Sequence, residues 1–484
     1  MPALLAILLC AATGWCAVRL ALPRPSKPDH VLTACLAGPF GLAVFSLDYF
    51  AWRLFSNSRT ALIGIDVTVL SALVLLLVWR TRTATPQPRL QTRTTTSNAN
   101  RIVTVLWVVF VATVAIALYC CIRLAKAEPE GGGWDAFAIW NLHARFLFLG
   151  GEHWRNGFTS LIPWSHPDYP LMLPAAIAHF WTYMKNDPEY VPAGIALVFT
   201  FSTAGLLCAA VRALRGSSQA LLAGIILLSS PFFLRQGVSQ YADVPLAFFI
   251  VATILFTLLN SARPAPRWLA MAGMTAALAA WTKNEGLLFF CAFLALFTVE
   301  VVREKNWAAL RSRIAPVLLG AAPVLLVLAW FKFAVAPSGD LFTSSATMLA
   351  KIADPARYWL ILRWFLKEVF LFSGWPLITV ILAVYAHVLG AGLPRKYKGI
   401  TAQSAAALGL TLAGYFAVYV ITPYDLKWHL RFSLDRLFLQ LWPSALLLFF
   451  MIVRTPEEWL AQPASAQPAA TSTPLPERVA DQAA

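Results

Sequence analysis

The sequence predicts an all-α polytopic membrane protein with about 13 transmembrane helices plus re-entrant or interfacial helices. The first observation behind this prediction is composition: of the 484 residues, 59% are hydrophobic and only 13% are charged, and the mean hydropathy is +0.66. A soluble domain of this size could not cover so much apolar surface. The second is that apolar runs of roughly 17–24 residues recur along the chain, each long enough to cross a bilayer as a helix.

Run length divides the chain into four parts. Residues 1–79 form an N-terminal unit of three spans, and the Thr- and Arg-rich segment 80–101 is expected to be a cytoplasmic linker. The main transmembrane unit covers 102–453, and the Pro-, Ala- and Gln-rich tail 454–484 is expected to be disordered and cytoplasmic. The expected spans are 1–20, 33–54, 61–79, 102–124, 190–211, 219–235, 241–260, 268–283, 286–302, 314–336, 368–390, 402–421 and 437–453.

The apolar but Pro-rich segment 168–184 decides the topology. If it crosses the membrane, the Lys/Arg clusters from Arg212 onward lie opposite the basic 80–101 segment. If it does not cross, all the basic loops share one side, as the positive-inside rule favours. The segment is therefore interpreted as re-entrant or interfacial, with the N-terminus outside and the C-terminus in the cytoplasm. The unusual polar motifs then gather on the extracytoplasmic face.

Charge and cysteine usage exclude other classes. The formal net charge is +15, but Lys and Arg are dispersed in short loops, which suits topology and contact with anionic membrane lipids rather than nucleic acid. The seven cysteines fall in apolar segments without a CxxC motif or metal-ligand spacing, as expected of small hydrophobic residues. The first positive charges follow the first apolar run, which favours a span over a cleaved signal peptide.

The motif GGGWDAF places Trp134 and Asp135 after a long apolar run, at the predicted water edge of the membrane. A carboxylate there has the chemistry to orient a hydroxyl group or take a proton from it. The alternative is a loop aspartate that caps a helix starting near Phe137. Two further motifs join an acid to a proline: His166-Pro-Asp168-Tyr-Pro, and Tyr241-Ala-Asp243-Val-Pro. Favourable acidic charge at a helix N-terminus is the alternative for both.

Two basic motifs are candidates for holding a phosphate group. Lys283 lies in a short polar turn between spans, where a surface pair with Glu285 is the alternative. The segment 422–436 is expected to be a loop, in which His429, Arg431 and Arg436 are crowded together. Arg431 and Arg436 have the forked geometry to clamp a phosphate, and an ion-paired loop is the alternative. Lys332 also stands near the outer end of an apolar run, where it is either a site residue or snorkels to the surface.

In this order the motifs resemble the GT-C class of integral membrane glycosyltransferases. The similar group comprises the protein O-mannosyltransferases, the aminoarabinose transferases and the Rgt-type lipopolysaccharide sugar transferases, that is, glycosyltransferase family 39. The resemblance covers roughly residues 102–453. It is carried by Trp134-Asp135, His166-Pro-Asp168-Tyr-Pro170, Tyr241-x-Asp243-x-Pro245, Thr282-Lys283 with Gly286, and the closing motif from Thr422 to Arg436.

The resemblance implies a glycosyltransferase of the plasma membrane (the inner membrane of a bacterium) with an extracytoplasmic active face. Its donor would be a sugar linked to a polyprenyl phosphate, and its acceptor a lipid, a glycan or a protein. Asp135 would be the general base, with Asp168 as a second catalytic carboxylate. Lys283, Arg431 and Arg436 would hold the phosphate, with Trp134, His166, Tyr241, Asp243 and His429 as further substrate-binding residues.

Three points depart from the family or stay open. The acidic loop has one clear aspartate where relatives often have a pair, and Asp168 stands within the His-Pro motif. No metal-ligand set is evident and no cofactor is expected, but a divalent metal stays open. The rival function is a transporter or lipid flippase, which would need polar residues at mid-membrane depth on broken helices in matched halves.

Overall fold

The computed structural model describes residues 2–23, 29–82, 97–128, 131–303, 307–339 and 345–461. Throughout these ranges the ordered elements are helices, and the one isolated β-bridge joins Ala391 to Val453. The first half comprises α1 (Pro2–Ala21), α2 (His30–Arg53), α3 (Arg59–Arg82), α4 (Ser97–Ala127), η1 (Ala136–Trp140), α5 (Asn141–Leu149), η2 (Gly151–Phe158), η3 (Pro163–Ser165), α6 (Met172–Met184), α7 (Tyr190–Arg215), α8 (Ser217–Leu228) and α9 (Pro231–Val238). The second half comprises α10 (Asp243–Ala262), α11 (Pro266–Thr282), α12 (Asn284–Arg303), α13 (Trp307–Ala334), α14 (Ser345–Ile352), α15 (Pro355–Phe370), η4 (Phe372–Gly374), α16 (Pro376–Leu389), η5 (Arg395–Tyr397), α17 (Lys398–Ile421), α18 (Leu426–Ile452) and α19 (Pro456–Leu460).

The predicted class is confirmed: this is an all-α polytopic membrane protein. Ten of the described helices are long and apolar enough to cross a bilayer, or up to eleven if one bent pair counts as a single span. The count is lower than the predicted thirteen or so for two reasons. The predicted span 268–283 is α11, a helix of 17 residues, and the longest helix within 368–390 is α16, with 14 residues.

Proline and serine residues break two of the predicted spans. The span expected at 219–235 divides into α8 and α9, which are bent by 67°. At this break Ser230 caps α9 by accepting a hydrogen bond from the Phe233 amide, and Pro231 occupies the first turn, where its missing N–H costs nothing. The second break precedes Pro376, where Ser373 adopts a left-handed conformation with φ 49°.

The last span begins much earlier than predicted. The segment 422–436, expected to be a loop, is helical from Leu426 onward because Asp425 caps α18 through the Trp428 amide. The charged residues of this segment therefore stand on a helix instead of crowding a loop. Arg431 and Arg436 are five positions apart, so their side chains project from different faces of α18.

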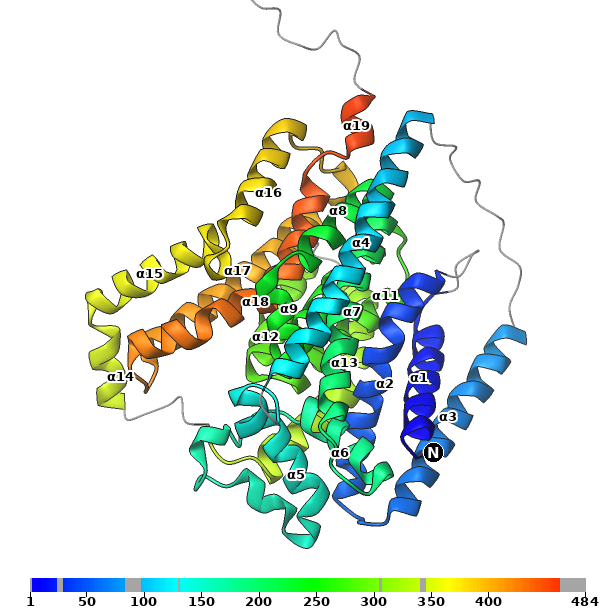
Figure 1. Ribbon diagram of the computed structural model, residues 1–484, viewed down its shortest axis with the longest axis vertical. Coiled ribbons are helices and arrows are strands. Elements are labelled where there is room, and N and C mark those ends of the chain that lie inside the picture. Colours follow the sequence, from blue (N-terminus) through cyan, green and yellow to red (C-terminus); the bar gives the residue numbers. More distant parts are fainter. Residues whose placement is uncertain are drawn as a thin grey trace, which may run out of the picture.

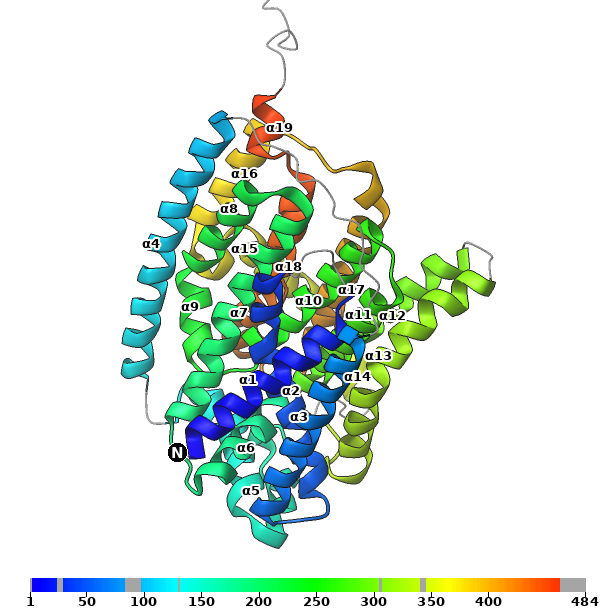
Figure 2. The same cartoon turned by 90° about the vertical axis from the view of Figure 1, so that its right-hand side faces the viewer.

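The helices are arranged around α10, which is buried along most of its length and packs against α7, α11 and α18. The N-terminal helices α1, α2 and α3 cover one flank, and α14, α15 and α16 lie on the opposite flank (Figure 1). Figure 2, turned by 90°, shows α4 along an outer edge. Most of α3 and α4 is unburied and apolar, as expected for helices facing lipid.

Close helix contacts rely on small residues. A Cβ atom on Gly273 of α11 would stand 1.9 Å from the Val317 carbonyl oxygen, and one on Gly320 of α13 would stand 1.9 Å from that of Ala270. Only glycine permits this backbone approach, which is the usual basis of tight helix packing in membranes. It fixes α13 against α11 and so helps to position Lys332 near the end of α13.

Contacts between distant segments define the two ends of the bundle. At one end, Arg80 and Arg267 both donate to the carbonyl oxygen of Leu20, and Arg215 pairs with Glu458 of α19. At the other end, Arg53 donates to the Leu147 carbonyl oxygen. We refer to these as the basic end and the site end. In Figure 1 they are marked by α19 at the top and α5 at the bottom.

The segment 168–184 lies at the site end but differs from a surface helix. Its helix α6 has 13 residues, too short to span a bilayer, and Met172 to Tyr183 are all buried. It packs against α2, α5 and α7 within the protein. The segment is thus a short helix buried within the protein, which agrees with the prediction that it does not span the membrane.

The boundaries of the four expected parts need small changes. Helix α3 continues to Arg82 and α4 begins at Ser97, so only 83–96 of the expected linker lies outside the described residues. The tail expected to be disordered begins with α19, which has a capping box between Thr455 and Glu458. Residues 462–484 lie outside the described residues.

Candidate functional site

The loop that carries Asp135 is held against the start of α10. A Cβ atom on Gly133 would stand 2.6 Å from the Tyr241 hydroxyl oxygen, so glycine is needed for the loop to approach this ring. Asn141 of α5 donates to the side-chain oxygen of Gln240 at 2.9 Å and to the Gly131 carbonyl oxygen at 2.8 Å. The three-glycine motif therefore brings Asp135 beside Tyr241.

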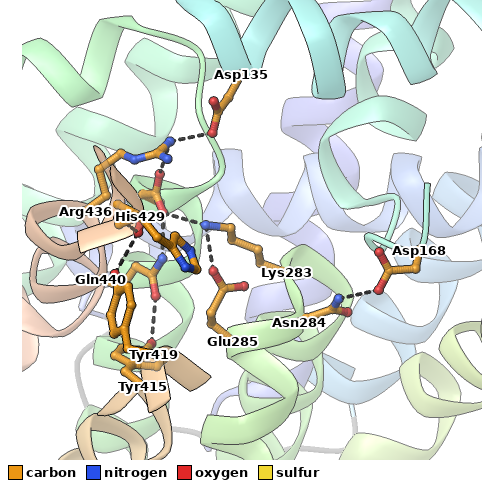
Figure 3. A network of polar contacts seen from close by, with 12 residues as sticks. Asp135, Asp168, Lys283, Asn284, Glu285, Tyr415, Tyr419, His429, Arg436 and Gln440 are labelled. Carbon is orange, nitrogen blue, oxygen red and sulfur yellow. Dashed lines mark hydrogen bonds and ion pairs between the residues drawn. The ribbon is translucent and has the colours of Figure 1, made fainter. Parts of the chain in front are cut away.

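Arg436 of α18 joins the loop to the helices (Figure 3). Its Nη1 donates to a carboxylate oxygen of Asp135 and lies 3.8 Å from Oδ2 of Asp243. The guanidinium carbon lies 5.1 Å from the centroid of the Tyr241 ring, which forms a cation–π contact. The side chains of Asp135 and Arg436 are 22% and 16% exposed, so this pair is accessible from outside.

A buried polar network lies beneath that pair (Figure 3). The Lys283 ammonium group lies 3.0 Å from Oδ1 of Asp243 and 2.9 Å from Oε1 of Glu285. Gln440 donates to Oδ1 of Asp243 at 2.6 Å and accepts from the Tyr415 hydroxyl at 2.7 Å. Asp243 is 1% exposed, and its partners compensate the cost of burying a carboxylate.

The charges around Lys283 keep this group protonated. Burial alone would lower the pKa of Lys283, but the charges of Asp243 and Glu285 outweigh burial and raise the pKa above its ordinary value. Tyr241 stays neutral for a related reason, because burial and the negative charge of Asp135 raise the pKa of its hydroxyl. At neutral pH the network thus holds a permanent cation next to Asp243.

Asp168 belongs to a separate cluster. Asn284 donates to Oδ2 of Asp168 at 2.7 Å. Lys332 donates to the backbone carbonyl oxygen of Asp168 at 2.5 Å and to Oδ1 of Asn284 at 2.7 Å. Figure 3 shows Asp168 well away from Asp135, with Lys283 and Asn284 between them. Because residues 283 and 284 adjoin in sequence, the two clusters share one short turn.

An aromatic stack lines the approach between the clusters. The Tyr169 ring stacks on His166 at 4.8 Å and on Trp140 at 5.6 Å, and the Lys283 ammonium group lies 5.9 Å from its centroid. Burial and the charge of Glu285 raise the pKa of Tyr169 well above its ordinary value. His143 lies behind the loop, and burial together with His166 lowers its pKa to about 3, so it is neutral.

Three predicted site residues lie at the edges of this arrangement. His429 contacts Thr422 through Nδ1 at 2.8 Å and packs edge-on against Tyr419. Trp134 is 70% exposed beside Asp135, available to a ligand but with little packing. Arg431 is exposed, with its guanidinium over Phe432 at 5.7 Å. The structure does not bring Arg431 together with Arg436.

Sequence reasoning did not identify several residues of the network: Asn284, Glu285 as a partner of a buried lysine, Tyr415 and Gln440. Gln440 and Tyr415 lie inside apolar runs and are isolated polar residues within predicted transmembrane helices. That is itself a signal, since an intramembrane polar residue needs a partner. The partner, however, lies 197 positions away in the case of Gln440 and Asp243.

This arrangement gathers acidic and basic side chains into one network. Asp135, Asp243 and Glu285 contribute three carboxylates, and Lys283 and Arg436 contribute two cations. In the Asp135–Arg436 pair, a carboxylate and a cation are both partly exposed to the outside. In the part of the chain that the structure describes, no group of three or more His, Cys, Asp or Glu side chains is placed to hold a metal ion.

Comparison with known proteins gives one match. Residues 165–330 match the family model of the dolichyl-phosphate-mannose-protein mannosyltransferases. This range contains Asp168, Asp243 and Lys283, whereas Asp135 and Arg436 lie outside it. No curated protein and no solved structure matches the chain at a significant level.

This range is therefore similar to a family of membrane glycosyltransferases, and the similarity suggests a sugar donor linked to a polyprenyl phosphate. The resemblance to the GT-C, family 39 group predicted from the sequence is thereby confirmed over residues 165–330.

Proposed function

We propose that this chain transfers a sugar from a polyprenyl-phosphate donor to a hydroxyl-bearing acceptor at the site end of the bundle, on the extracytoplasmic side of the plasma membrane. The observation that carries the proposal is the accessible contact between Asp135 and Arg436, supported from below by Asp243 and Lys283. A carboxylate suited to an acceptor hydroxyl and a cation suited to a leaving phosphate thus stand side by side. The acceptor is a lipid, a glycan or a protein.

The roles follow from the charge that develops during transfer. As the acceptor oxygen bonds to the anomeric carbon, its proton passes to the Asp135 carboxylate. The bond from the anomeric carbon to the phosphate oxygen breaks, and the electron pair leaves with the polyprenyl phosphate. Arg436 neutralises this oxygen through its forked donors, and Lys283 supports the same charge from deeper in the site. A single displacement of this kind inverts the anomeric configuration.

The same contact sets an order of events. Arg436 donates to a carboxylate oxygen of Asp135, so the base is held by the group that should bind the phosphate. A phosphate that attracts Arg436 releases Asp135 to meet the acceptor. Asp243 also lies 3.8 Å from Arg436, and it keeps the guanidinium near the site during this exchange. Donor binding should therefore precede productive acceptor binding.

The test compares glycans and glycolipids by mass spectrometry in cells without the chain and in cells supplied with wild type or Asp135→Asn. Wild type should restore a product with one added sugar. Asp135→Asn should reduce its rate of formation by about 10²–10⁴-fold while inserting and accumulating normally, because it removes the base but keeps the size of the side chain.

The matched control is Asp425→Asn, which changes the aspartate that caps the N-terminus of α18, the helix that carries Arg436. Asparagine caps a helix as well as aspartate does, so this variant should keep normal transfer. Near-normal turnover in Asp135→Asn would remove Asp135 from the mechanism. A solute flux in proteoliposomes with no glycosidic product would contradict the proposal and would indicate a transporter or flippase.

A further inference from the structure

A cavity lies at the basic end, far from the Asp135–Arg436 pair. It has a volume of about 520 Å³, within the usual range of ligand pockets. Helix α10 begins at Asp243 in the candidate site and ends near the cavity at Asn260 and Ser261. At 1.5 Å per residue this separates the two places by about 27 Å along the helix. The cavity is therefore independent of the transfer site.

Its mouth is cationic. Arg313 of α13 and Lys396 of η5 line it together with a single carboxylate, Glu300 of α12. Nη2 of Arg313 lies 3.6 Å from Oε1 of Glu300. Two cations against one carboxylate leave a net charge of +1 on the lining, which matches one phosphodiester group. Other basic residues are close by in sequence but do not line the cavity: Arg263, Arg267, Arg303, Arg311, Arg395 and Lys398.

Two residues that line the cavity and the crevice beside it have side-chain atoms without hydrogen-bond partners among the described residues. Oε2 of Glu300 is buried with no hydrogen-bond donor among the described residues. A narrow crevice continues from the cavity past Thr257 and Ile400 to Gln403, whose side-chain N and O atoms are likewise buried and unpaired within the described structure. Each such buried group lowers the stability of the fold unless a ligand or water satisfies it. The cavity is therefore built for a polar occupant.

Its walls are apolar where the helices meet. Leu269, Phe297 and Ile400 line the cavity beside the cations. The inner crevice has room for only about 10 Å³, roughly one water molecule, so an extended hydrocarbon chain does not fit there. The occupant should thus place a small polar group in the cavity while its apolar part remains in the bilayer.

We infer that this cavity binds the headgroup of an anionic phospholipid from the leaflet at the basic end. The phosphodiester would lie between Arg313 and Lys396, and a headgroup hydroxyl would donate to Glu300. Basic pockets between transmembrane helices are known to hold phosphate-bearing headgroups. A phosphatidylglycerol headgroup has both the single negative charge and the hydroxyl donors that this lining requires.

The experiment measures the thermal unfolding midpoint of the full-length, delipidated protein in detergent. Added phosphatidylglycerol should raise the midpoint of wild type by about 2–5 °C, because a ligand that binds only the folded state stabilises it. Phosphatidylcholine, which has no net charge and no headgroup hydroxyl, should raise it by less than 1 °C, about the noise expected for a lipid with no specific site. The Arg313→Gln, Lys396→Gln double variant should lose the phosphatidylglycerol shift.

The control double variant, Arg303→Gln with Lys398→Gln, removes the same charge from residues that do not line the cavity. It should keep the shift. Equal loss in the control, an equal shift with phosphatidylcholine, or an equal shift with millimolar inorganic phosphate would each overturn the inference; the last would assign the cavity to a soluble anion. If the double variant does not fold, Lys396→Gln alone changes an exposed side chain and should reduce the shift by more than half.

Discussion

Two clusters of charged residues at the site end differ in one respect, which is access. In the first, Asp135 and Arg436 are 22% and 16% exposed above the buried Asp243. In the second, Asp66 of α3 meets His179 of α6 at 2.9 Å, and both side chains are 0% exposed. Each cluster joins helices that are distant in sequence through a carboxylate.

The second cluster is closed on every side. Tyr183 donates to the same Asp66 oxygen that contacts His179. The other ring nitrogen of His179 lies 3.0 Å from the Phe45 carbonyl oxygen, and its ring stacks on Phe45 at 3.9 Å. No substrate reaches these atoms, so their contribution is to dock the N-terminal helices on α6. Intramembrane charge therefore indicates chemistry only where the structure also provides a route to it.

Of the substitutions at Arg436, Asp66 and Asp168, Arg436→Gln should cause the largest loss of transfer. This variant removes the cation from the leaving phosphate and leaves Asp135 without its partner, so transfer should fall by about 10²-fold or more. Steady-state kinetics should show a higher KM for the donor together with a lower kcat. Arg431→Gln is the matched control on the same helix and should stay within about twofold of wild type, since Arg431 is exposed and outside the network. Equal losses in the two variants would mean that Arg431 also binds substrate.

In Asp66→Ala we expect the reverse pattern, in which stability falls and turnover is kept. His179 and Tyr183 would lose their acceptor in a sealed interior, which should destabilise the protein by about 2–4 kcal/mol. Thermal unfolding and cellular accumulation should both fall, while turnover per folded molecule should stay near normal. Asp66→Asn keeps one acceptor oxygen and should lose less. A stable Asp66→Ala protein with greatly reduced turnover would show that the closed cluster takes part in transfer.

A modest loss of transfer is expected in Asp168→Asn. Asp168 interacts with Asn284 and Lys332 and has no described contact with Asp135 or Arg436, so we expect it to position the turn that carries Lys283. Asparagine can still accept from Asn284, and the loss should be about tenfold or less, or roughly 1.4 kcal/mol. The measurement is kcat and KM for both substrates. A loss as large as that of Asp135→Asn would make Asp168 a second catalytic carboxylate.

Local patterns were sufficient to predict much of the site. Trp134-Asp135, Asp243 and Lys283 each stand at the end of an apolar run, and charge asymmetry between loops placed all of them at one end. The structure brings Asp135, Asp243, Lys283 and Arg436 into one network, as drawn in Figure 3. Arg431 was grouped with Arg436 only because both were expected in a loop, and the helix that begins at Leu426 separates them.

By itself the sequence determined the class of protein, the order of most spans and the end of the bundle that carries the acidic motifs. These depend on run length, hydropathy and charge, which are properties of local segments. Only the tertiary structure decided which acid meets which base, that Asp168 stands apart from Asp135, and that the Asp66 cluster is sealed. Several of these pairs join side chains more than one hundred positions apart, as with Arg436 and Asp135 at a separation of 301, and no local pattern encodes which of many helix faces will meet.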